Sequence, residues 1–104
     1  MLVKINAASF DSSPELNAHV QDQVDKATQR FAARVTRVDV HLHDDNAHKK
    51  SATDKRCVLE ARLTGMEPLT VEHAGEDVYK TVAEAAGKLE RLIGHKLERL
   101  GDRH

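Results

Sequence analysis

Histidine and carboxylate side chains, which bind metal ions, gather in the run His41-Leu42-His43-Asp44-Asp45. Two imidazoles and a carboxylate are a donor set that suits zinc or nickel. The run stops short of a His-x-His-x-Asp-His motif, because position 46 is Asn. We therefore expect no metal centre, and an exposed strand face that tolerates histidines is the plainer interpretation. If a metal did bind, the sequence would place it at His41, His43 and His48.

Cys57 is the one cysteine of the 104-residue chain, so it cannot form an internal disulfide. It alternates with Leu59 and Ala61, which predicts a buried side chain that packs as a small apolar group. If the thiol were exposed, the neighbouring Lys55 and Arg56 would lower its pKa, and a redox sensor is therefore the alternative. A single cysteine and a start without a secretory leader indicate a cytoplasmic protein.

Residue sets that carry out catalysis are missing from the sequence. It contains no glycine-rich phosphate loop, no Ser, His and Asp set, and no close pair of carboxylates. We therefore expect neither an enzyme nor a cofactor, and no small-molecule substrate.

Lysine and arginine side chains offer a different chemistry, which is the neutralisation of phosphate groups. Two groups of basic residues recur at helical spacing. The first is Lys26, Arg30 and Arg34, followed by Arg37. The second is Lys88, Arg91, His95 and Arg99. Two such stripes on neighbouring helices would form a groove for a nucleic-acid backbone.

An ordinary solvated surface is the alternative for these charges, because acids alternate with bases along the second group. Lys80, Glu84 and Lys88 are spaced for a ladder of i,i+4 ion pairs. Over the whole chain, 16 Lys and Arg against 17 Asp and Glu give a formal net charge of −1. This balance excludes a uniformly cationic nucleic-acid binder, but it allows one whose charge lies on a single face.

The elements that must position these side chains follow from the spacing of apolar residues. Alternating polarity predicts strands at 2–8, 35–43, 56–64 and 69–73. Apolar residues at intervals of three and four predict helices at 14–32 and from 76 to about 100. Ser13 is expected to cap the first helix, and Asp77 suits the cap or first turn of the second. The polar residues 44–55 are typical of a mobile hairpin loop.

The predicted order of elements is β-α-β-β-β-α, in one domain over residues 1–104. Because the strands alternate in polarity, one face of the sheet is apolar and the other polar. We expect an α+β fold, a two-layer sandwich whose four-stranded sheet carries both helices on one face and leaves the other face to solvent. No apolar run approaches the roughly 20 residues of a membrane span.

Two segments in the second half of the chain carry a family resemblance. Ala74-Gly75-Glu76-Asp77-Val78-Tyr79, followed by Lys88-Leu89-Glu90-Arg91, resembles the signature of the ribosome hibernation-promoting factor family. Its members are also called ribosome-associated inhibitors, ribosomal subunit interface proteins or sigma-54 modulation proteins. The order of elements resembles that family over nearly the full length, and the length is that of the short forms without a C-terminal dimerisation domain.

This resemblance implies a bacterial stress-response protein with a fold similar to double-stranded-RNA-binding domains. It would occupy the decoding region of the 30S subunit in the path of mRNA and tRNA, inhibit translation and stabilise idle ribosomes, as a monomer. Its helix-borne cations would contact rRNA phosphates, as in recognition of RNA by shape. By position the resemblance assigns this role to Lys26, Lys88 and Arg91. The predicted rRNA-binding set adds Arg30, Arg34, Arg37, His95, Lys96 and Arg99.

The second helix departs from the family pattern. Where members often have Lys-Leu-x-Arg-Gln-Leu-x-Lys, this chain has Leu92, Ile93, Gly94 and His95 after Arg91. A Gln and a Lys are therefore missing, and Gly94 destabilises a helix interior by ~1 kcal/mol relative to Ala. These changes lower the density of positive charge and indicate a divergent branch.

A protein-interaction module without RNA binding is the second hypothesis for the function. It would use the loop 44–55 and the open face of the sheet. The polar residues expected on that face are Arg37, Asp39, His41, Glu60, Arg62 and Glu72. A mixed-charge interface of this kind would depend much less on salt concentration than phosphate binding does.

Overall fold

The elements of the protein appear in the order that the sequence predicts. A computed structural model describes residues 1–7, 13–44 and 55–101. The strands are β1 (Leu2–Asn6), β2 (Val35–Asp44), β3 (Lys55–Leu63) and β4 (Leu69–Gly75). The helices are α1 (Pro14–Thr28) and α2 (Val78–Gly101), with a short 3₁₀ helix, η1 (Gln29–Phe31), directly after α1. The predicted α+β class and the β-α-β-β-β-α order are confirmed.

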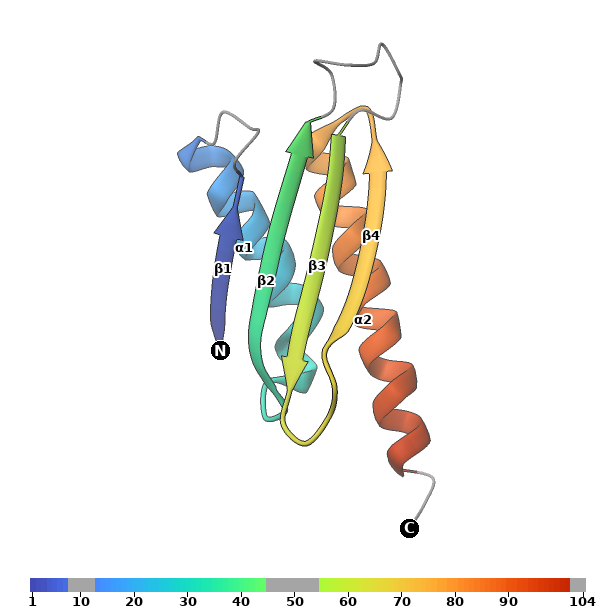
Figure 1. Cartoon of the computed structure of the whole chain (residues 1–104). Coiled ribbons are helices and arrows are strands. Elements are labelled where there is room, and N and C mark those ends of the chain that lie inside the picture. The colour runs from blue at the N-terminus through green and yellow to red at the C-terminus, as the bar shows by residue number, and fades with distance from the viewer. Residues whose placement is uncertain (8–12, 45–54, 102–104) are drawn as a thin grey trace.

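The four strands lie side by side in the order β1-β2-β3-β4. β1 runs parallel to β2, whereas β3 is antiparallel to both of its neighbours. The parallel pair follows from the connection, because α1 carries the chain back along the sheet before β2 begins. Both helices lie behind the sheet in Figure 1, so that its other face is open. This is the predicted two-layer arrangement.

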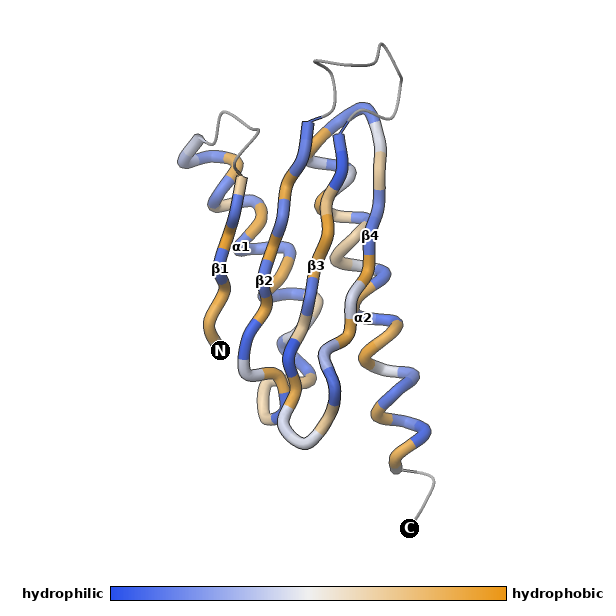
Figure 2. Tube along the Cα trace, viewed as in Figure 1, coloured by the Kyte–Doolittle hydropathy of each residue, from blue (hydrophilic) through white to orange (hydrophobic). Residues whose placement is uncertain are grey.

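Apolar side chains form rows across the sheet on the helix side. In one row the register aligns Ile5 with Val40, Val40 with Leu59, and Leu59 with Val71. Polar residues alternate with them along each strand, which Figure 2 shows as a change between orange and blue along the tube. The helices complete the core with predicted apolar positions. The buried ones include Leu16, Val20, Val24, Val82, Leu89 and Ile93.

Both helices begin at a side chain that satisfies free backbone N–H groups. The hydroxyl of Ser13 accepts a hydrogen bond from the N–H of Leu16 at 3.1 Å. The carboxylate of Asp77 accepts from the N–H groups of Tyr79 at 2.8 Å and Lys80 at 3.3 Å. The sequence therefore predicted closely where each of the two helices begins. Neither helix in the described ranges is long and apolar enough to cross a membrane.

The first helix ends earlier than the predicted 14–32. Its regular part stops at Thr28, whose buried hydroxyl donates to the carbonyl of Val24 at 2.8 Å. A threonine bonded to the preceding turn in this way commonly bends or weakens a helix. The chain then tightens into η1, where side chains follow a three-residue period. Arg30 and Arg34 therefore do not continue a helical stripe from Lys26.

α2 is joined to the edge strand β4 by two polar side chains. Nε2 of His73 lies 2.7 Å from Oε2 of Glu84, and Nζ of Lys88 donates to the carbonyl of Glu72 at 3.0 Å. The predicted ladder from Lys80 through Glu84 to Lys88 is thus replaced, in the described part of the chain, by contacts that fix the helix to the sheet.

The hairpin between β2 and β3 is predicted as a mobile loop at 44–55. The strands reach further than expected, to Asp44 and from Lys55, and an ion pair of 3.4 Å joins these two residues. The expected mobility concerns residues 45–54, which lie outside the described residues, as does His48.

Candidate nucleic-acid interface

The C-terminal half of α2 presents exposed basic side chains. They are Arg91, His95, Lys96 and Arg99, and we call them the α2 basic cluster. None of the four forms an ion pair or side-chain hydrogen bond with any other residue that the structure describes. A cation without a protein partner gives up no protein contact when it meets a phosphate, which makes these residues good candidates for binding RNA.

Lys88, one turn before the cluster, reaches the sheet as well as the solvent. Its hydrogen bond to the carbonyl of Glu72 satisfies a group on β4, the last strand of the sheet. A lysine at such an edge also discourages pairing with the strand of another molecule. The ammonium is exposed and has three N–H donors, so it can hold β4 and contact a phosphate at the same time.

Arg30 extends from η1 toward α2 rather than along α1. Its Nε lies 3.9 Å from Oε2 of Glu90 in α2, and its Cζ lies 4.7 Å from the centre of the Phe31 ring. Its Nη2 is close to the backbone of Gly94. The side chain is nevertheless 63% exposed. Arg30 thus adds an exposed cation beside α2, at a position next to Arg91 of the α2 basic cluster.

α1 does not provide the second basic stripe that the sequence suggested. Nζ of Lys26 pairs with the carboxylate of Asp22 at 3.1 Å. Two further acids on this helix, Glu15 and Asp25, are exposed. A phosphate backbone laid along α1 would therefore meet three carboxylates and one ammonium. The exposed positive charge is concentrated along α2 and at Arg30, not in a groove between two basic helices.

Arg34 and Arg37 are bonded to groups outside the helices. Nη2 of Arg34 donates to the carbonyl of Thr64 at 3.2 Å, and so holds the turn between β3 and β4. Nε of Arg37 lies 2.9 and 3.1 Å from the two carboxylate oxygens of Asp39 on the open face of the sheet. One sheet face carries the helices and the other carries Arg37, so a single flat RNA surface cannot contact both Arg37 and the α2 basic cluster.

The open face of the sheet carries opposite charges that neutralise each other. Arg37 pairs with Asp39, and Arg62 lies 3.6 Å from Glu60. Asp39 is only 8% exposed, although the sequence places it on the solvent side. This face is the surface named in the protein-interaction hypothesis, and it offers little net charge to a phosphate backbone.

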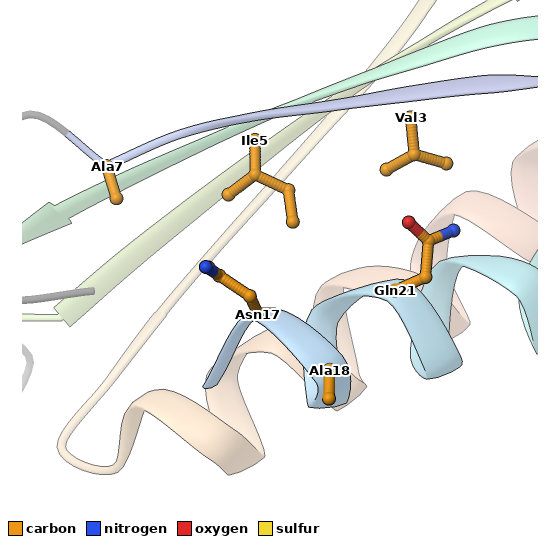
Figure 3. Close-up of a pocket in the computed structure, with 6 residues that line it drawn as sticks. All are labelled: Val3, Ile5, Ala7, Asn17, Ala18 and Gln21. Atoms are coloured by element: carbon orange, nitrogen blue, oxygen red, sulfur yellow. The ribbon is translucent and has the colours of Figure 1, made fainter. Parts of the chain in front are cut away.

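A hollow of about 440 Å³ lies between β1 and α1. Figure 3 shows Val3, Ile5 and Ala7 directed toward the helix, with Asn17 and Gln21 directed back toward the strand. Amides and apolar groups cannot serve as acid, base or nucleophile at neutral pH. The hollow therefore gives no support to a catalytic function.

The metal and redox alternatives receive no support from the described side chains. Within residues 1–7, 13–44 and 55–101, no three His, Cys, Asp or Glu side chains are grouped so that they could hold a metal ion. His41 and His43 lie on the open sheet face, and His48 is outside those ranges. Cys57 is fully buried, and desolvation raises its pKa to about 12. A thiol in that state is a poor nucleophile, because the thiolate is the reactive form.

Phe31 and Gly94, the neighbours of Arg30, were not predicted as part of the site. A glycine inside a helix can mark a close approach by another group, and Gly94 stood out in the sequence as an unfavourable residue. That signal could not reveal which group approaches, since Arg30 is distant in the chain.

These features define the class of the protein: a two-layer α+β protein with a mixed four-stranded sheet and one exposed basic helix. A ribosomal subunit interface protein from Coxiella burnetii has a similar structure, with a TM-score of 0.80 and 18% identity over 94% of this chain and 99% of that chain. The N-terminal domain of Protein Y from Thermus thermophilus is also similar, with a TM-score of 0.70 and 18% identity over 89% and 96%. At these identities the likeness shows the fold.

The family follows from the sequence itself. A family model described as sigma 54 modulation protein / S30EA ribosomal protein matches residues 3–101. The chain belongs to this family, which confirms the resemblance of its 74–79 and 88–91 segments. The family is one of ribosome-associated hibernation factors, which are not enzymes. A search of curated proteins found no match.

Proposed function

We propose that this chain is a ribosome hibernation factor that binds rRNA of the small subunit near the decoding region. Bound there, it would block the path of mRNA and tRNA, inhibit translation and stabilise idle ribosomes in the cytoplasm under stress. It would act as a monomer and a single domain, without catalysis or a cofactor. The observation that carries this proposal is the α2 basic cluster, which is exposed and unpaired within the described residues.

The binding mechanism in this proposal is electrostatic and steric. α2 presents exposed cations along its C-terminal half, and these replace counterions on the RNA backbone. A-form RNA is recognised mainly through its shape and its phosphates, and this suits a surface with few aromatic side chains. Inhibition then follows from occupancy, because a folded domain in the channel leaves no room for mRNA and tRNA.

Co-sedimentation with 30S subunits and with 70S ribosomes tests the proposal. The wild-type chain should migrate with the particles at low salt and be released at high salt. Lys88→Glu with Arg91→Glu should abolish migration while the circular dichroism spectrum is unchanged. Lys4→Glu with Lys80→Glu is the matched control, because it changes the net charge equally on exposed residues outside the cluster.

Three results would contradict the proposal. The wild-type protein could stay at the top of the gradient even at low salt. The two double variants could lose binding equally, which would mean that only net charge matters. Binding could also be indifferent to salt and lost through changes on the open face, which would favour the protein-interaction module.

A further inference from the structure

Arg30 is held on three sides by groups from two elements. Cζ of its guanidinium lies over the ring of Phe31, 4.7 Å from the ring centre. Its Nε lies 3.9 Å from Oε2 of Glu90 in α2. Its Nη2 rests against α2 at Gly94. Long exposed arginines usually sample many rotamers, and contacts of this kind reduce that freedom.

Gly94 provides the space for this arrangement. A Cβ built at this position would lie 3.0 Å from Nη2 of Arg30 and 3.7 Å from Cζ of Phe31. The first distance is tighter than most real contacts, so a side chain here would displace the guanidinium by a few tenths of an ångström. The second is an ordinary contact, so Phe31 could stay in place. Glycine is otherwise an unfavourable residue in the interior of a helix.

The contacts leave one edge of the guanidinium without a hydrogen bond, although Nη2 also packs against Gly94. The distance from Nε to Glu90 is that of a long ion pair and not of a hydrogen bond. Nη1 and Nη2 form no hydrogen bond with the residues that the structure describes. These two nitrogens form the end-on edge of arginine, which binds two oxygens of a phosphate at once. Gly94 is three residues after Arg91 of the α2 basic cluster, a spacing at which side chains are neighbours on a helix, so a backbone bound at Arg91 can reach this edge as well.

We propose that Gly94 and Phe31 are positioning residues that fix Arg30 as a bidentate phosphate ligand beside the α2 basic cluster. This inference rests on the proposed binding of rRNA. It gives the unfavourable helix glycine a role in binding, and it identifies the ligand of Arg30 as a phosphodiester of the RNA backbone. Arg30 contacts the phosphate, and Gly94 acts only through Arg30.

A double-mutant cycle tests the coupling between the two residues. The variants are Gly94→Ala, Arg30→Ala and their combination, measured for affinity to 30S subunits across a range of salt concentrations. Arg30→Ala should weaken binding about five- to tenfold, as expected for one charge-assisted contact at an exposed site. Gly94→Ala should weaken it about threefold in the wild-type background and by less than about 1.5-fold when Arg30 is already Ala.

Two further readouts separate positioning from a structural role. Gly94→Ala should leave the Tm equal to or above that of the parent, because Ala favours the helix and the displaced group is the flexible end of Arg30. Both single variants should reduce the slope of log K against log salt by roughly one phosphate contact. The matched control is Gly94→Ala in an Arg91→Ala background, where its threefold effect should persist.

Several outcomes would overturn the inference while leaving rRNA binding intact. One is an equal loss of affinity from Gly94→Ala with and without Arg30. Another is a Tm below that of the parent, which would make Gly94 a packing residue of the fold. If the wild-type chain does not bind 30S subunits at low salt, the proposed function fails first, and the phosphate role of Arg30 fails with it.

Discussion

Gly75 and Asp77 belong to the segment that carries the family resemblance, and the structure gives both a task in folding. Asp77 caps α2. A Cβ built on Gly75 would lie 2.6 Å from the buried hydroxyl of Thr81, so only glycine lets β4 turn this closely past the first turn of α2. The residues that make the family recognisable are therefore partly those that join β4 to α2.

Gly75→Ala should lower the free energy of unfolding by about 1–3 kcal/mol, because the added methyl group overlaps a buried atom in a packed region. Urea denaturation followed by circular dichroism measures the loss. In a Thr81→Ala background the same substitution should cost much less, since the overlapping hydroxyl is gone. An equal cost in both backgrounds would show that the backbone of Gly75, not its contact with Thr81, is what matters.

Cys57 makes stability depend on pH in the alkaline range. Burial raises its pKa to about 12 in the folded protein, against 9.0 for an exposed thiol. The folded state therefore keeps a proton that the unfolded state has lost, and stability falls as pH rises from 9 toward 12. Between these values the free energy of unfolding should decrease by about 1.4 kcal/mol per pH unit from this group alone.

Comparison with Cys57→Ala isolates that contribution, because lysine and tyrosine titrate in the same range. The variant should be less stable at pH 7, owing to the smaller side chain in the core, and should lack the part of the alkaline decline due to the thiol. Parallel stability curves for the two proteins would count against the buried neutral thiol.

At the scale of elements, α2 is both a core helix and the candidate binding surface. One side buries Val82, Leu89 and Ile93, while Arg91 and Arg99 are exposed. The two roles rest on different positions of the helical wheel, so binding can change without loss of the core.

Lys88 and Arg91 should differ although both match the family pattern. Lys88→Met removes the hydrogen bond to the carbonyl of Glu72, so it should lower stability by up to about 1 kcal/mol as well as weaken ribosome binding. Arg91→Met should weaken binding with stability within about 0.5 kcal/mol of the parent, as usual for an exposed surface residue. Thermal unfolding and co-sedimentation on the same two samples distinguish them, and identical profiles would contradict this division of roles.

At the scale of the whole molecule, charge is separated by surface although the formal sum is −1. α1 is acidic, the open sheet face pairs its charges except for Lys4, and most exposed cations of the described residues lie along α2 and at Arg30. Association with RNA should therefore have a preferred orientation, with α2 toward the phosphates.

This separation of charge predicts that the affinity for RNA depends moderately on salt concentration. If the α2 basic cluster, Lys88 and Arg30 make about four to six phosphate contacts, the slope of log K against log salt should lie between about −3 and −5. Filter binding of 30S subunits at several potassium concentrations measures it. A slope near zero would mean that phosphates do not dominate the interaction.

The sequence by itself determined the type and order of the elements. The alternation of Val38, Val40 and Leu42 with polar residues and the caps at Ser13 and Asp77 are local signals, and each was matched in the structure. The segments 74–79 and 88–91, which carry the family resemblance, are local signals as well. These features depend on residues that are close together in the chain, so they can be read from the sequence alone.

Only the tertiary structure decided which charges share a surface. Arg37 lies on the opposite face from α2, Lys26 is paired on an acidic helix, and Arg30 crosses to Gly94. These placements depend on the end of α1 at Thr28 and on contacts between residues far apart in the chain. Helical spacing predicts which side chains share a face only within a helix. Beyond the end of the helix, the direction of the chain depends on how side chains distant in the sequence pack together.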